Sequence, residues 1–145
     1  MRTVALFSIV VDDYDRAIRH YCHDLGFELV SDMDEGRKRS VVIRPAGAPA
    51  GATGIVLARA SDDEQRSRIG NQTGGRVGFF LHTDDFARDH AAMGAAGVHF
   101  HEDPRHEIYG TVAVFEDAYG NLWDLLQPAD EPDDDGVVAT PSATS

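Results

Sequence analysis

The chain has 145 residues, of which 42% are hydrophobic and 26% charged, and its formal net charge is −12. This size suits one compact domain or two small modules, and no apolar run approaches the roughly 20 residues that a membrane-spanning helix needs. The acidic balance excludes nucleic acid and anionic membranes as expected partners and is compatible with a neutral or cationic ligand. The single cysteine, Cys22, and an N-terminus without a signal-peptide pattern predict a cytoplasmic protein.

The first half of the chain predicts one helix between strands. Residues 4–11 are an apolar, β-branched run interrupted only by Ser8, which predicts a largely buried strand. Asp12 or Asp13 then supplies a helix N-cap, and Gly26 ends the helix. His20 and His23 fall outside the apolar stripe of this helix and are expected to face solvent. The strands of this half are predicted at residues 4–11, 27–30, 39–44 and 54–60.

The second half repeats the first. Asp84, Asp85, Phe86 and Arg88 stand 72 positions after Asp12, Asp13, Tyr14 and Arg16. Asp84 or Asp85 is the predicted N-cap, and Gly97 ends the helix. The inward side of this helix is predicted to hold Phe86, Ala92, Met93 and Ala96. Strands are predicted at residues 76–82, 98–101, 111–115 and 122–127, with Gly120-Asn121 in the last turn.

Each half therefore reads strand, helix, strand, strand, strand, and one helix covers only one face of such a sheet. Two halves can bury their bare faces together, within one chain or by exchange between two chains. The expected fold class is α+β, with two βαβββ modules forming a curved, barrel-like mixed sheet around a cavity and the helices outside. A homodimer is expected. The predicted parts are a first module (1–60), a linker (61–75), a second module (76–128) and a disordered acidic tail (129–145).

Two stretches carry a family resemblance: "VDDYDRAIRHYCHDLGFELV" (11–30) and "YGTVAVFEDAYGNLWDLLQP" (109–128). They resemble the vicinal oxygen chelate superfamily, which is also called the glyoxalase/bleomycin resistance/dioxygenase family. The resemblance covers about residues 3–128. It implies the fold more than the reaction, because the family includes isomerases, epimerases, dioxygenases, antibiotic-modifying enzymes and proteins that only sequester drugs.

The resemblance also implies where a metal would be held. Metal-dependent members place one His, Gln or Glu on the first strand and another on the fourth strand of each half. Here these positions fall on Leu6, Leu57, Gly78 and Asp124. One carboxylate cannot supply the three protein donors that a transition metal needs, so no metal and no other cofactor are expected.

Alternation along the strands predicts which residues face the cavity. Leu57 and Arg59 are expected on one side, and Asp124 shares a side with Leu126. Burial would raise the pKa of Asp124 unless Arg59 or His82 pairs with it, and both Asp124 and His82 are candidate catalytic acids or bases. The predicted ligand-binding residues are Leu6, Ser8, Leu57, Arg59, Phe80, Tyr109 and Leu126. Ser8 has no obvious base, and a buried, hydrogen-bonded hydroxyl is the favoured interpretation.

His99 and His101 alternate with Val98 and Phe100, so they share one strand face. A His-x-His pair can chelate a metal, although a solvated face opposite a buried one is the favoured interpretation.

Three functions follow from these residues. The first is a metal-free protein that binds an apolar or cationic small molecule. The second is a metal-independent lyase, isomerase or epimerase that uses Asp124 and His82. The third is a metal-dependent enzyme of the glyoxalase or dioxygenase kind, which the missing ligands oppose.

Overall fold

The computed structural model describes residues 1–130 and divides the chain into two compact units, Met1–Gln72 and a second unit that begins at Thr73. The predicted tail, residues 129–145, lies outside the described residues except for its first two. Within residues 1–130, no helix is long and apolar enough to cross a membrane.

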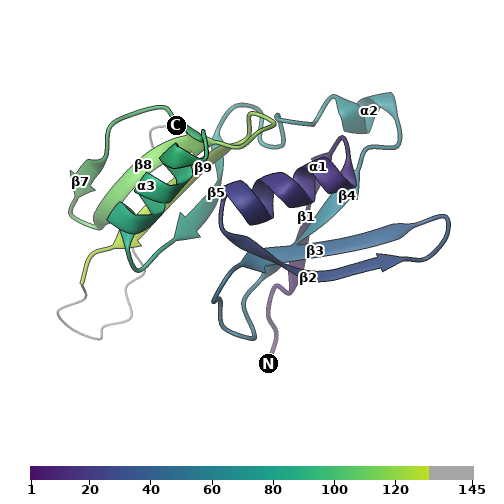
Figure 1. Cartoon of the computed structure of the whole chain (residues 1–145), viewed down its shortest axis with the longest axis horizontal. Helices are drawn as coiled ribbons and strands as arrows, with labels where there is room; N and C mark the ends of the chain where they lie inside the picture. Colours follow the sequence, from purple (N-terminus) through teal and green to yellow (C-terminus); the bar gives the residue numbers. More distant parts are fainter. Residues whose placement is uncertain (131–145) are drawn as a thin grey trace. The chain divides into compact units, whose positions relative to one another are not determined.

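The first unit is a four-stranded mixed sheet with one main helix (Figure 1). The sheet order is β1-β4-β3-β2, in which β1 and β4 are parallel and the other pairs antiparallel. Its elements are β1 (Leu6–Val11), α1 (Tyr14–Arg19), the π-helical turn η1 (His20–Asp24), β2 (Phe27–Asp34), β3 (Arg39–Pro45), β4 (Gly54–Arg59) and the short α2 (Asp63–Arg66).

The second unit repeats this topology, with strand order β5-β9-β8-β6 and an additional short strand, β7, that also pairs with β8. Its elements are β5 (Val77–His82), α3 (Phe86–Ala95), β6 (His99–Phe100), β7 (Arg105–Glu107), β8 (Gly110–Glu116) and β9 (Leu122–Pro128). The fold is therefore α+β with two mixed sheets, as the sequence predicts. Strand β7 was not predicted.

The repeated aspartate pairs have one physical role in both units. The second aspartate caps the helix: Asp13 accepts a hydrogen bond from the Arg16 backbone N–H at 2.8 Å, and Asp85 accepts one from that of Arg88 at 3.0 Å. The first aspartate forms an ion pair one helical turn along, which joins Asp12 to the Arg16 guanidinium at 2.7 Å. The Asp84–Arg88 pair repeats it at 3.0 Å.

A glycine with positive φ follows the helical segment formed by α1 and η1, and another follows α3. Gly26 has φ 75° and Gly97 has φ 91°, a backbone conformation that other residues rarely adopt. The sequence predicts both ends correctly.

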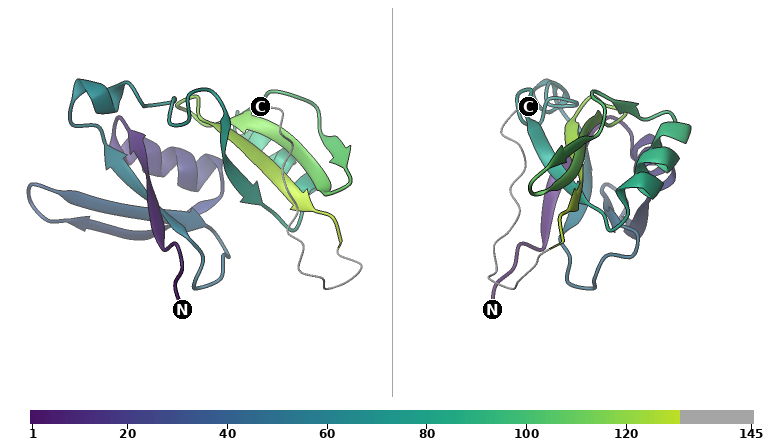
Figure 2. Two further views of the ribbon diagram at one scale, coloured as in Figure 1. Left: turned by 180° about the vertical axis from the view of Figure 1, so that it is seen from behind. Right: turned by 90° about the vertical axis from the view of Figure 1, so that its left-hand side faces the viewer.

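Helices α1 and α3 each cover one face of their own sheet, as the views of Figure 2 show. The covered face of the first sheet holds the main apolar core of that unit, which consists of Ile9, Val11, Val41, Ile43, Ile55 and Leu57. The prediction that residues 4–11 are largely buried was wrong for the beginning of the strand, where Leu6 is 50% exposed. Alternate residues of β1 point away from α1, and we call that side the helix-free face.

The inward side of α3 differs from the prediction. Ala92 and Ala96 are exposed, whereas Phe86 and Met93 are buried. His90 lies between them on the same side, because its ring stacks on Phe86 at a centroid distance of 5.3 Å. The stripe therefore follows the spacing i, i+4, i+7.

His20 is also a correction, since it is only 9% exposed. The chain widens from an α-helix to a π-helical turn at this residue, which rotates the positions that follow relative to an α-helical pattern. The His20 Nδ1 atom lies 2.9 Å from a carboxylate oxygen of Asp24, so the buried ring is paired.

Candidate functional site

In the second sheet, Phe115 lies on the side of α3, because it contacts Phe100, which contacts His90 of that helix. The opposite side, the helix-free face, holds most of the predicted site residues of that unit. The strand register places Phe80 beside Asp124, and His82 beside Leu126. Paired residues on neighbouring strands point to the same side of a sheet. Phe80 is 47% exposed and His82 is exposed, whereas Asp124 and Leu126 are buried. An exposed aromatic ring therefore lies next to a buried carboxyl group.

The first unit corrects the prediction for β4. Ser8 pairs with Val56, while Leu57 pairs with the buried Ile9. Leu57 therefore faces α1, and Arg59, two residues later, points to that same side of the sheet. Neither residue shares a face with Leu6 and Ser8, and the prediction was wrong by one strand position. Ser8 is exposed, and its hydroxyl is not the buried group that was expected.

This register also identifies the true counterpart of Asp124 in the first unit. Ser8 and Phe80 are 72 positions apart and occupy equivalent places in the repeat. Because Ser8 pairs with Val56 and Phe80 pairs with Asp124, Val56 occupies the family position that the sequence resemblance assigned to Leu57. Like leucine, valine has no ligand atom.

The remaining family metal position, Gly78, has no room for a ligand side chain as the chain is folded. A Cβ atom built on Gly78 would lie 2.3 Å from the Thr73 methyl carbon Cγ2. The Thr73 hydroxyl donates to the backbone oxygen of Arg76 at 2.6 Å, which holds this side chain in place. Asp124 is then the only residue with a donor atom among the family positions, and the residues present do not fit the family's metal.

Asp124 lies in a charged but water-poor environment, and it is only 2% exposed. Burial raises the pKa of its carboxyl group to about 6, with the charge of Arg105 opposing the shift and that of Glu102 adding to it. The sequence suggested Arg59 or His82 as charge partners. The charged groups that shift the pKa of Asp124 are Arg105 and Glu102 instead.

Arg105 is the centre of this polar cluster. Its guanidinium lies 3.0 Å from a carboxylate oxygen of Glu102 and 3.2 Å from one of Glu107. Glu102 is fixed in turn, because its second oxygen accepts the backbone N–H of Val114 at 2.9 Å. Val114 pairs with Asp124 on the neighbouring strand. The cluster thus joins β7 and the segment before it to the central strands β8 and β9.

Tyr109, one of the predicted ligand-binding residues, belongs to the same cluster. Burial lowers the pKa of Arg105, and the neighbouring Glu102 and Tyr109 raise it by more, so the guanidinium remains charged. The Tyr109 hydroxyl is buried and has no hydrogen bond of good geometry within the described residues. It is a polar group for which a ligand could supply a partner.

Sequence reasoning missed Arg105 and Glu102 because it treated their segment as a loop. Arg105 lies on β7, where it pairs with Val112 of β8. One charged residue in a three-residue strand and another just before it carry no periodic signal from which their contact could be inferred.

Comparison with known proteins agrees with the fold. The sequence profile of the Glyoxalase/Bleomycin resistance protein/Dioxygenase superfamily matches residues 3–125. An uncharacterized protein of Shewanella frigidimarina is 49% identical over 132 residues, which are 90% of this chain and 96% of that protein. The chain belongs to this superfamily.

Two solved structures are similar over most of their length. UcmS2 has a TM-score of 0.73 and 28% identity, covering 87% of this chain and 98% of that protein. TnmS3, an antibiotic-binding protein from Streptomyces sp. CB03234, has a TM-score of 0.70 and 30% identity, covering 89% of this chain and 98% of that protein.

Proposed function

We propose that this chain binds a small organic molecule on the helix-free face of its second sheet, without a metal ion at the family position. The observation that carries the proposal is the register pair Phe80 and Asp124, which sets an exposed aromatic ring beside a buried carboxyl group. Phe80 offers an apolar contact surface, and Asp124 offers a hydrogen-bonding group that fixes orientation.

Three further features support binding. The Tyr109 hydroxyl lacks a good partner, the net charge of −12 favours neutral or cationic ligands, and TnmS3 is an antibiotic-binding protein. We therefore propose an aromatic, neutral or cationic ligand of the kind found among antibiotics. The donor-poor family positions support binding without metal.

The experiment is a thermal-shift screen of aromatic antibiotics, neutral and cationic, against the full chain in excess EDTA. A ligand specific for the folded state raises the melting temperature by an amount that grows with the logarithm of its concentration relative to Kd. Substitution Phe80→Ala should weaken the best ligand by about tenfold, the loss of one aromatic contact. Leu29→Ala, which removes an exposed apolar side chain of the first unit, is the matched control and should leave affinity unchanged.

A second candidate is acid–base catalysis by a metal-independent lyase or isomerase. It is favoured by the pKa of Asp124, because a group with a pKa of about 6 can both donate and accept protons near neutral pH. His82 lies on the same face, two residues along from the position paired with Asp124. Turnover of a bound ligand that is lost in Asp124→Asn while binding persists would select this candidate over simple binding.

A further inference from the structure

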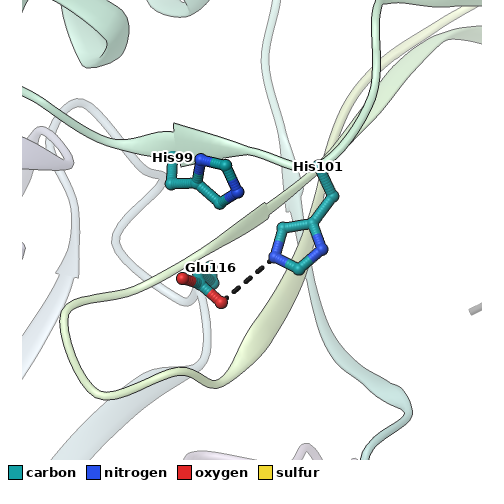
Figure 3. Close-up of side chains that lie close together, drawn as sticks. All are labelled: His99, His101 and Glu116. Carbon is teal, nitrogen blue, oxygen red and sulfur yellow. Dashed lines mark hydrogen bonds and ion pairs between the residues drawn. The ribbon is translucent and has the colours of Figure 1, made fainter.

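A second polar group lies at the β6 edge of the second sheet, apart from the family position. His99 is on β6 and His101 follows two residues later, so both side chains point to one side of the strand. Glu116 of β8 is the register partner of His99. His99 on β6, His101 just after that strand and Glu116 across from His99 form a triangle of side chains, which Figure 3 shows.

The three side chains already face one another. The imidazole rings of His99 and His101 are 5.0 Å apart, and the His101 Nε2 atom lies 3.1 Å from a carboxylate oxygen of Glu116. One nitrogen from each histidine and one oxygen from the glutamate all lie within 4.8 Å of one another. Ligand atoms around a tetrahedral ion are about 3.4 Å apart for bonds of 2.0–2.1 Å, so small rotations of exposed side chains complete the set.

We propose that His99, His101 and Glu116 bind one divalent transition-metal ion, such as Zn²⁺, Ni²⁺ or Cu²⁺. Two imidazoles and one carboxylate are the donors that these ions prefer, and they are unsuited to Mg²⁺ or Ca²⁺, which take oxygen ligands. The side chains of His101 and Glu116 are 40% and 37% exposed, so the ion can enter from solvent and keeps coordination positions open to water or another ligand.

The site is separate from the family's metal position, which uses the first and fourth strands of each unit and fails here for lack of donors. It also does not depend on the proposed binding of an organic molecule. The competing explanation is an exposed ion pair between His101 and Glu116 that recruits no metal, and the experiment distinguishes the two.

The experiment is isothermal titration of the full, chelator-stripped chain, prepared without a histidine tag, with Ni²⁺, Zn²⁺ and Cu²⁺. The structure predicts one ion per chain, with Cu²⁺ bound tightest. His99→Ala, His101→Ala and Glu116→Gln should each weaken binding by about tenfold or more, since each removes one ligand. Circular dichroism and thermal melting should show that these substitutions of accessible side chains leave the fold intact.

Two control variants make the result specific. His23→Ala removes an exposed histidine of the first unit, and Asp124→Asn removes the carboxylate of the organic-ligand site; neither should change metal affinity. In NMR spectra of the Cu²⁺ complex, the paramagnetic ion should broaden the imidazole signals of His99 and His101 and leave that of His23 unchanged. Absence of binding to the wild type at about 0.1 mM metal would overturn the proposal, because protein sites with three ligands bind such ions with a far lower Kd. So would an affinity unchanged in His99→Ala and His101→Ala.

Discussion

The buried carboxyl group of Asp124, on the helix-free face, lowers the stability of the native state at neutral pH. Its pKa of about 6 lies above the ordinary 3.8, so between these values the native state holds a proton that the unfolded chain has released. Native stability therefore falls as pH rises from about 4 to 6, and the full cost, about 3 kcal/mol, is present above pH 6.

Replacing Asp124 with asparagine should recover part of that cost. Asp124→Asn keeps the shape and removes the charge, while Arg105 retains Glu102 and Glu107. We expect the free energy of unfolding in urea to rise by about 1–3 kcal/mol at pH 7.5 and to change little at pH 4. An increase of equal size at both values, or a loss of stability at pH 7.5 alone, would contradict the burial of a charged carboxylate.

Asp117 is a buried acid with a structural role. Its carboxylate accepts hydrogen bonds from the backbone N–H groups of Tyr119 and Asn121, both at 3.0 Å, and from the side chains of Asn121 and Trp123, at 3.0 Å and 3.1 Å. These hydrogen bonds stabilise the turn between β8 and β9, and β9 is the strand that carries Asp124.

Asp117→Ala should leave these buried donors without an acceptor and lower the free energy of unfolding by about 3 kcal/mol or more. The matched control is Asp103→Ala, which removes an exposed acid of the same unit and should cost about 0.5 kcal/mol or less. Urea denaturation at pH 7.5 measures both. Equal losses in the two variants would show that the network does not stabilise the turn.

At the level of elements, the sequence predicts what depends on local signals. The order of strands and helices, the capping aspartates and the glycine helix ends follow from neighbouring residues. The sheet face to which a strand residue points does not follow from neighbouring residues, because a shift of one residue reverses it. This is why Leu57 and Arg59 were placed on the wrong face. The burial of His20 was missed for a similar reason, because the π-helical turn changes which residues face the sheet.

The two aspartates before α3 allow the cap and the ion pair to be measured separately. Asp85→Ala removes a hydrogen bond to a backbone N–H at the helix end and should cost about 1 kcal/mol. Asp84→Ala removes only an exposed ion pair to Arg88 and should cost about 0.5 kcal/mol or less. Urea denaturation of the two variants gives the comparison. If Asp84→Ala were the more costly change, the roles assigned to the repeated pair would be reversed.

At the level of the whole molecule, we propose that the chain forms a homodimer. β1 and β5 each end their own sheet, and both carry exposed apolar side chains, Leu6 and Phe7 on β1 and Phe80 on β5. Exposed apolar edge strands favour association unless they are covered. Light scattering of the full chain should give twice the 15.8 kDa chain mass, and Leu6→Glu should shift it toward the monomer. A mass of one chain at about 0.1 mM, a concentration at which even weak dimers form, would exclude the dimer.

The most direct test of the proposed function is calorimetric titration, in excess EDTA, of the strongest aromatic ligand from the thermal-shift screen into the wild type, Phe80→Ala and Asp124→Asn. We predict saturable binding to the wild type without metal, weakened about tenfold by Phe80→Ala and altered in affinity by Asp124→Asn. Binding that disappears when metal is chelated, or that neither substitution changes, would contradict a metal-independent site on this face.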